Sequence, residues 1–273
     1  HRRPPEGKIY LNPGRVRHVA PQPPIERKIS ISKVPTIMSS DALPYGYELH
    51  DYSIESVLGT GGFGITYLAH DSKLGTRVAI KEYFPQDLAR RNEQMTIVPG
   101  PGAAAETFEW GRRQFLKEAQ ALAQFKHNNI VRVLRFLELN GTAYMIMEYE
   151  QGQGLQDYIR SKGRPDERML LQVFLPILNG LQAVHRAGLL HLDIKPDNIY
   201  LRADGSPMLI DFGSARRIAR GTDKAAGPVA LTPAYAAIEP SPGRGTQGPW
   251  TDIYSSGASL YRCISGSDPV DAL

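Results

Sequence analysis

The sequence contains a single cysteine, Cys263, among its 273 residues. An internal disulfide needs two cysteines, so a disulfide-stapled secreted domain is excluded and the reducing cytosol is favoured. The chain also lacks an apolar run long enough to cross a bilayer, and it has no signal peptide with a basic start and an apolar core. We therefore expect a cytoplasmic location and no membrane segment in this chain. Because the chain begins at His1 rather than at a methionine, we also expect a fragment or a processed form.

The overall composition is that of an ordinary folded protein. Hydrophobic residues make up 41% and charged residues 22% of the chain, which excludes a disordered or fibrous protein. No internal repeat is apparent, so a solenoid is not expected. A chain of this length can bury a sizeable core, either as one large domain or as two lobes.

The net charge of +4 is unevenly distributed along the chain. Residues 1–45 hold eight lysines and arginines, three acidic residues and eight of the 21 prolines, without helix or strand periodicity. This composition predicts a flexible basic tail. A basic tail can bind nucleic acid or acidic lipid, but aromatic and basic residues are not interleaved and no dense basic run occurs. A solvated leader is therefore favoured, and we expect no nucleic-acid partner.

The pattern of residues 46–150 predicts a small lobe with five strands and one helix. Short apolar stretches indicate the strands, and Asn140-Gly141 between the last two is a strong hairpin signal. A polar insertion containing proline and glycine spans residues 85–105, and after it Phe115 and Leu122 belong to an apolar stripe at helical spacing. The predicted strands are residues 52–60, 65–71, 77–83, 130–139 and 142–148.

Residues 151–273 predict a mainly helical lobe with a few short strands. A long apolar helix is expected to open at Pro165 and to end near Gly188, because glycine commonly stands just beyond a helix end. Pro176 inside this helix should kink it or leave a backbone carbonyl unpaired. The other predicted elements are strands at 199–201 and 208–210 and a last helix at 250–264.

Five short motifs occur in order along the chain. Gly-Thr-Gly-Gly-Phe-Gly at residues 59–64 lies between two predicted strands, and Val-Ala-Ile-Lys at 78–81 belongs to the third. They are followed by His-Leu-Asp-Ile-Lys-Pro-Asp-Asn at 191–198, Asp-Phe-Gly at 211–213 and Ala-Ile-Glu at 237–239. Each motif alone is weak evidence, but five ordered matches in suitable structural contexts rarely arise by chance.

The glycine-rich motif is the first candidate for ligand binding. Gly59, Gly61 and Gly64 let the backbone approach a polyphosphate closely and adopt conformations closed to other residues. An ordinary glycine-rich hairpin is the competing interpretation of this motif taken alone. A P-loop or Rossmann site is disfavoured, because the motif lacks a Gly-Lys-Ser/Thr ending and is flanked by strands on both sides.

Together the five motifs resemble the signature of the protein kinase family, in its bacterial serine/threonine type. The resemblance implies an α+β, bilobal protein-kinase-like fold. In that fold a small antiparallel-sheet N-lobe with one helix (46–150) is followed by a mainly helical C-lobe (151–273). We expect the C-lobe to be incomplete, because kinases normally continue through several more helices. The resemblance also implies ATP and Mg²⁺ as cofactors, and transfer of the γ-phosphate to serine or threonine hydroxyls of protein substrates, autophosphorylation included.

The resemblance assigns a nucleotide site to the N-lobe and the adjoining hinge segment, residues 148–154. Met147 would gate the back of the adenine pocket, and backbone groups of Glu148 and Glu150 would pair with adenine. The residues expected around the nucleotide are Gly59, Thr60, Gly61, Gly62, Phe63, Gly64, Ala79, Lys81, Met147, Glu148 and Glu150.

Lys81 would bridge the α- and β-phosphates of ATP, a role that requires an anionic partner to hold the ammonium group. Glu118 is the preferred partner because it lies beside the apolar stripe of the predicted helix. Glu106 and Glu109, nearer the start of that helix, are the competitors.

The remaining catalytic residues are expected in the second lobe. By the resemblance, Asp193 would accept the proton of the acceptor hydroxyl, and Lys195 would neutralise charge on the γ-phosphate. Asn198 and Asp211 would bind Mg²⁺. Lys195 and Thr232, in a segment that resembles the one docking the acceptor residue, are typical of serine/threonine kinases.

Three features depart from the family pattern. Leu192 replaces the arginine that would pair with a phosphate on the activation segment, so we predict activity that does not require phosphorylation of Thr222 or Thr232. Ile238 replaces a proline, which is a mild change. The third departure is the early end of the C-lobe. In contrast, Asp252 resembles the helix aspartate that supports the catalytic loop.

Two alternative functions stay open at this point. A catalytically silent kinase-like binding module is favoured by Leu192 and by the early end of the C-lobe. It is opposed by the presence of Lys81, Asp193, Asn198 and Asp211. Another phosphoryl or nucleotidyl transfer on the same fold is also conceivable, because a fold does not determine a function.

Overall fold

The computed structural model describes residues 41–212, 216–217, 232–239 and 246–271. The predicted tail, apart from residues 41–45, lies outside the described residues, as do Gly213 and Thr222. Within the described ranges no helix has both the length and the apolar character that a membrane crossing requires.

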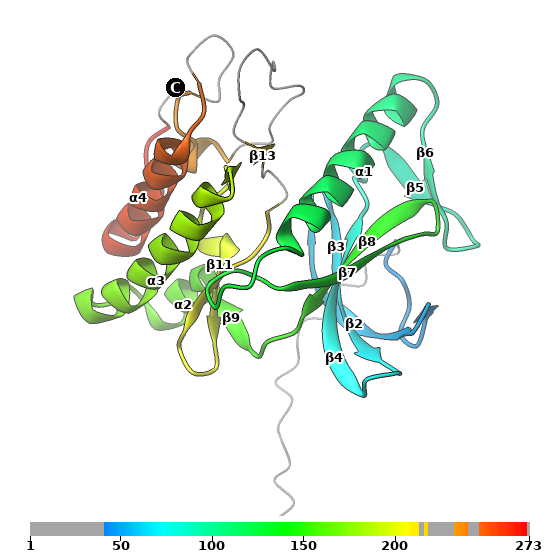
Figure 1. Cartoon of the computed structure of the whole chain (residues 1–273), viewed down its shortest axis with the longest axis horizontal. Coiled ribbons are helices and arrows are strands. Elements are labelled where there is room, and N and C mark those ends of the chain that lie inside the picture. Colours follow the sequence, from blue (N-terminus) through cyan, green and yellow to red (C-terminus); the bar gives the residue numbers. More distant parts are fainter. Residues whose placement is uncertain (1–40, 213–215, 218–231, 240–245, 272–273) are drawn as a thin grey trace, which may run out of the picture. The chain divides into compact units, whose positions relative to one another are not determined.

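The first part of the chain folds into a six-stranded antiparallel sheet with the strand order β1-β2-β3-β4-β8-β7 (Figure 1). All five predicted strands are present. The additional strand β1 has only two residues, too few to show an alternating pattern. The bounds are β1 (Glu48–Leu49), β2 (Tyr52–Gly61), β3 (Gly64–Asp71), β4 (Thr76–Tyr83), β7 (Val133–Leu139) and β8 (Thr142–Glu148).

The hairpin predicted at Asn140-Gly141 joins β7 to β8. Both turn residues have positive φ, 51° and 70°, as a two-residue hairpin turn of the type favoured by Asn-Gly requires. β7 begins at Val133 rather than at residue 130. The reason is that the backbone before it pairs elsewhere: the Val131 N–H donates to the Leu209 carbonyl at 2.9 Å.

The insertion at residues 85–105 contains a short hairpin, β5 (Ala89–Arg91) and β6 (Ile97–Pro99), which the polar sequence did not suggest. Arg91 anchors this hairpin to the sheet, because its Nη2 lies 2.6 Å from Oε2 of the buried Glu82. The hydroxyls of Tyr67 and Tyr144 donate to the same carboxylate, each at 2.8 Å. The buried ion pair is therefore saturated with hydrogen bonds, the condition under which such a pair is tolerated in a core.

Helix α1 (Ala103–Leu122) follows the hairpin and lies beside the sheet, in contact with β7 and β8 (Figure 1). It buries Phe108, Phe115, Ala119 and Leu122 at the predicted helical spacing, together with Glu118. The ring centroid of Tyr83 at the end of β4 lies 5.2 Å from that of Phe108, so the helix packs directly on the strand that carries Lys81.

The later part of the chain is mainly helical, as predicted. The carboxylate of Asp166 accepts from the Met169 N–H at 2.8 Å and caps α3, which continues past Pro176 to Arg186. α4 packs against α3 (Figure 1). The helices are α2 (Leu155–Lys162), α3 (Glu167–Arg186) and α4 (Pro249–Ser265), with single turns η1 (Pro196–Asn198) and η2 (Pro233–Tyr235). The short strands are β9 (Gly152–Gly154), β10 (Leu189–Leu190), β11 (Ile199–Arg202), β12 (Pro207–Leu209) and β13 (Arg216–Arg217).

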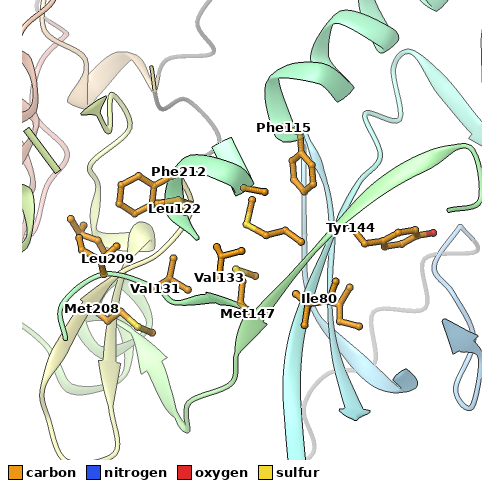
Figure 2. Packing of buried hydrophobic residues seen from close by; sticks show 14 of the residues in the cluster. Ile80, Phe115, Leu122, Val131, Val133, Tyr144, Met147, Met208, Leu209 and Phe212 are labelled. Carbon is orange, nitrogen blue, oxygen red and sulfur yellow. The ribbon is translucent and has the colours of Figure 1, made fainter. Parts of the chain in front are cut away.

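One hydrophobic cluster includes residues from both parts of the chain. Figure 2 shows Ile80 and Met147 from the sheet in the same cluster as Leu209 and Phe212 from the later segments. Ile80, Ile194 and Phe212, which belong to three of the five motifs, are members of this cluster. Packing therefore holds the backbone that carries Lys81, Asp193 and Asp211.

Candidate active site

The motif at residues 191–198, the candidate catalytic loop, is held by a buried carboxylate on α4. Asp252 accepts the backbone N–H groups of His191 and Leu192 at 2.9 and 2.8 Å, and its Oδ2 lies 2.7 Å from Nε2 of His185. Leu192 has φ of 65°, a left-handed conformation that is uncommon for a residue with a side chain. The two bonds to Asp252 stabilise this turn, as expected for an aspartate that supports the loop.

Three polar side chains gather around Asp193. Its Oδ2 accepts from Lys195 Nζ at 2.8 Å and from the amide nitrogen of Asn198 at 3.0 Å. Its Oδ1 accepts from the hydroxyl of Thr232 at 2.8 Å, and Lys195 also donates to that hydroxyl at 2.8 Å. The structure thus brings together three of the predicted site residues and adds Thr232, which stands 39 residues beyond Asp193.

Lys81, near the end of β4, forms an ion pair with Oδ1 of Asp211. Burial alone would lower the pKa of Lys81, but the negative charges of Asp211, Glu118 and Asp193 raise it above its ordinary value. The lysine is therefore charged at neutral pH. Its position joins the N-lobe motif to the Asp-Phe-Gly motif.

Glu118, the predicted partner of Lys81, is buried on α1 but makes no ion pair with it in this structure. Burial raises the pKa of Glu118 to about 8; the nearby Lys81 opposes this shift and Asp211 adds to it. Glu118 thus lies within electrostatic range of the lysine, while Asp211 makes the direct contact. The residue expected to hold Lys81 and the residue that holds it here are different.

Asp211 is presented by a strained backbone next to a buried aromatic ring. Its φ is 59°, in the left-handed region. The ring of the following Phe212 packs on the buried imidazole of His191 with centroids 4.3 Å apart. Burial lowers the pKa of His191, so the imidazole is neutral at physiological pH. This packing connects the Asp-Phe-Gly motif to the catalytic loop.

The glycine-rich motif forms the turn between β2 and β3. At Gly64 a Cβ would lie 1.8 Å from the Glu82 carbonyl oxygen, so the close approach of β3 and β4 requires glycine there. The Phe84 N–H donates to the Phe63 carbonyl at 2.9 Å and pins the end of the turn. At Gly59, Gly61 and Gly62 a Cβ would meet no atom within 4 Å. Packing inside the protein therefore does not explain these three glycines.

The hinge segment follows β8. Met147 stands opposite Ala79 in the β4–β8 pairing, so two predicted nucleotide residues are neighbours. The Glu148 N–H donates to the Arg132 carbonyl at 3.0 Å. The carbonyl of Glu150 accepts from the Tyr200 hydroxyl at 3.1 Å, a contact that was not predicted. No local pattern signals it, because it depends on the pairing of β9 with β11.

Two cavities adjoin these elements. One of about 290 Å³ lies beside the glycine turn, between Thr60–Gly62 and the insertion residues Gln86 and Asp87. The other, of about 830 Å³, borders the hinge but is not lined by Ala79, Lys81 or Asp193. We place the candidate site by the convergence of polar groups, because the larger cavity touches none of these three residues.

Comparison with known proteins identifies the family that the five sequence motifs resemble. The family described as "Protein kinase domain" matches residues 52–272. "Serine/threonine-protein kinase PknK" of Mycobacterium tuberculosis is 35% identical over 211 residues, 77% of this chain and 17% of that protein. "Probable serine/threonine-protein kinase PknB" of Bifidobacterium longum is 32% identical over 242 residues, 84% of this chain and 32% of that protein.

A solved structure is similar as well. The chain titled "PpkA-294 apo form" has a TM-score of 0.75 and 38% sequence identity, covering 85% of this chain and 82% of that one. The present chain spans less than a third of the length of the two curated relatives. Since the family matches most of its residues, the chain belongs to the protein kinase family.

Proposed function

We propose that the chain transfers the γ-phosphate of ATP to serine or threonine hydroxyls of protein substrates. The observation that carries this proposal is the cluster of Lys195, Asn198 and Thr232 around Asp193. The relatives named as serine/threonine kinases support the same activity. We also propose that residues 46–150 and 151–273 are the two lobes, with residues 1–45 as a tail.

The acceptor hydroxyl would be activated by Asp193. Its carboxylate is the only group of the cluster that can accept the hydroxyl proton, because Lys195 is a donor and the Asn198 amide nitrogen is already directed at Asp193. Lys195 would neutralise charge on the transferred group. The Thr232 hydroxyl donates to Asp193 and would hold its carboxylate in one rotamer. The base would then be oriented before the acceptor hydroxyl reacts.

The nucleotide would lie between the glycine turn, Lys81 and the hinge. The open space where a Cβ would stand at Gly59, Gly61 and Gly62 suits the close approach of phosphates to the backbone. Thr60 and Phe63 lie in the same turn, and the buried Met147 with Ala79 borders the adenine end. Backbone groups of Glu148 and Glu150 would then pair with the adenine.

Asn198 and Asp211 fit the role of Mg²⁺ ligands. The amide nitrogen of Asn198 is committed to Asp193, so the amide oxygen is the atom that can bind a cation. The described residues contain no cluster of three histidine, cysteine or carboxylate groups suited to a metal. Two protein ligands suffice for Mg²⁺ when phosphates and water complete its shell. Bound Mg²⁺ would neutralise phosphate charge during transfer.

Transfer of labelled γ-phosphate tests this proposal. The chain is incubated with Mg·ATP and a generic basic protein, and wild type is compared with Asp211→Ala. We expect label on the substrate with wild type and almost none with the variant. A folded, monodisperse wild-type sample that incorporates no label would instead indicate the silent binding module.

A further inference from the structure

The hinge segment is fastened to β11 by a continuous series of contacts. β9 pairs antiparallel with β11, with Gly154 opposite Tyr200 and Gly152 opposite Arg202. The Ala203 N–H then donates to the Gln151 carbonyl at 2.8 Å and extends the backbone pairing by one residue toward β8. These bonds hold residues 151 to 154 in place without a ligand.

Side chains of β11 continue the series to Glu150, where the backbone pairing ends. The Tyr200 hydroxyl donates to the Glu150 carbonyl at 3.1 Å. Nε of Arg202 lies 3.1 Å from Oε1 of the same residue. Arg202 is itself held, because its Nη2 donates to the Asn128 carbonyl at 2.8 Å. The backbone and the side chain of Glu150 are therefore both anchored to one strand.

Glycine at position 152 makes this arrangement possible. A Cβ there would lie 2.0 Å from the Leu201 carbonyl oxygen and 2.8 Å from Cε1 of Tyr200. A larger residue would push the hinge segment off β11 and away from the tyrosine. The contact between Tyr200 and Glu150 therefore requires the close approach of Gly152 to β11.

The hydroxyl of Tyr200 acts as a donor across the physiological pH range. Burial raises the pKa of Tyr200 to about 12, and the nearby Tyr149 and Glu150 add to the shift. The phenol therefore keeps its proton at neutral pH. A neutral hydrogen bond of this kind contributes a modest net free energy, but it also fixes the direction of the carbonyl.

We propose that Tyr200 is a positioning residue for the adenine nucleotide. By holding the Glu150 carbonyl, its hydroxyl fixes the peptide plane between residues 150 and 151. The Glu150 N–H lies in the preceding peptide plane and is restricted in turn through φ and ψ of residue 150, whose side chain is held by Arg202. The hinge is then already in its binding conformation when the nucleotide arrives, so less ordering free energy is lost on binding. This inference rests on the proposed function, which assigns the backbone of Glu150 to adenine recognition.

Replacement of one oxygen atom tests the proposal. Tyr200→Phe keeps the ring and removes the hydroxyl. We expect the KM for ATP to rise about two- to tenfold, as for the loss of one hydrogen bond, with kcat unchanged at saturating ATP. The unfolding midpoint should stay near that of the wild type. Tyr158→Phe on α2 is the matched control, since the Tyr158 hydroxyl makes no hydrogen bond to another described residue, and it should leave KM unchanged.

The outcomes separate this inference from the proposed function. An active wild type whose KM for ATP is the same in Tyr200→Phe would overturn the positioning role. A fall in kcat and in the unfolding midpoint without a change in KM would also overturn it, because the hydroxyl would then serve stability. If the wild type transfers no phosphate, the proposed function fails. In that case the dissociation constant of Mg·ATP, measured by calorimetry for both proteins, decides on Tyr200.

Discussion

Lys81 and Glu82 are consecutive residues of β4, so their side chains point to opposite faces of the sheet. The two charged groups differ in how completely their neighbours satisfy them. On one face Glu82 is fully buried and is saturated by Arg91, Tyr67 and Tyr144. On the other face Lys81 has two nearby acids, Asp211 and Glu118, and pairs with only one. Every charged atom of the first group has a partner, whereas beside the second a buried acid, Glu118, makes no ion pair with any residue that the structure describes.

We interpret the first as a structural ion pair and the second as one proposed to act in nucleotide binding. A buried pair that only stabilises a fold must satisfy every polar atom, because each unsatisfied group costs free energy. Glu82 meets this condition. Glu118, beside Lys81, has no ion-pair partner among the described residues. Substitutions on the two faces should therefore have different consequences.

The largest effect is expected when the structural pair is broken. Arg91→Met leaves the buried carboxylate of Glu82 without its cation, and we expect the free energy of unfolding to fall by about 3–5 kcal/mol. Denaturant unfolding followed by circular dichroism measures this change. The double variant Glu82→Leu/Arg91→Met removes both charges and should recover part of the loss. Equal stability of Arg91→Met and wild type would contradict the structural role.

The Lys81–Asp211 pair, proposed to act in nucleotide binding, should behave in the opposite way. Lys81→Met removes a cation whose side chain is 12% exposed and whose partner Asp211 is 42% exposed, so the partner stays in contact with solvent. We expect the free energy of unfolding to change by less than about 1 kcal/mol. Phosphoryl transfer, however, should fall about 100- to 1000-fold, because charge stabilisation in the transition state is lost. A variant that is strongly destabilised and active in its folded fraction would reverse the comparison.

Part of the fold and of the candidate site could be predicted from the sequence. The strands, the Asn140-Gly141 hairpin and the motif at residues 191–198 are each encoded by a short local run of residues. The partner of Lys81 was assigned from the apolar stripe of α1, but the ion pair depends on the left-handed backbone at Asp211. The anchoring of the insertion by Arg91 and the contact of Thr232 with Asp193 both join distant segments, so no local pattern predicts them.

Titration of Glu118 should make the stability of the fold depend on pH. Its pKa rises from an ordinary value of 4.5 to about 8 on folding, so the folded state holds the proton more tightly than the unfolded state between these values. The stability contributed by protonated Glu118 is fully present below pH 4.5 and is lost as the pH rises toward 8. The slope is at most about 1.4 kcal/mol per pH unit.

Glu118→Gln removes this titration. We expect the difference in unfolding free energy between variant and wild type to move in favour of the variant as the pH rises from 5 to 8. Urea unfolding of both proteins at several pH values measures it. A difference that is constant over this range would show that Glu118 is ionised when buried. The raised pKa of Glu118 would then be contradicted.

The smallest effect is expected from phosphorylation of the chain itself. The charges around Asp193 come from Lys195 and from other groups of the protein, and the buried Leu192 cannot pair with a phosphate. A phosphatase-treated preparation should therefore transfer phosphate at the same initial rate as an untreated one. Mass spectrometry confirms removal of phosphate. Activity that appears only after phosphorylation of Thr222 or Thr232 would show that another residue replaces the missing arginine.

The most direct test of the whole account is the identity of the phosphorylated residue. The chain is incubated with Mg·ATP and a generic basic protein, and phosphoamino acids are quantified for wild type and Asp193→Asn. We predict phosphoserine or phosphothreonine with wild type and a loss of at least about 100-fold in the variant, because asparagine cannot accept the hydroxyl proton. Equal phosphorylation by both proteins, or none by a folded wild type, would contradict the assignment of Asp193 as the catalytic base of a protein kinase.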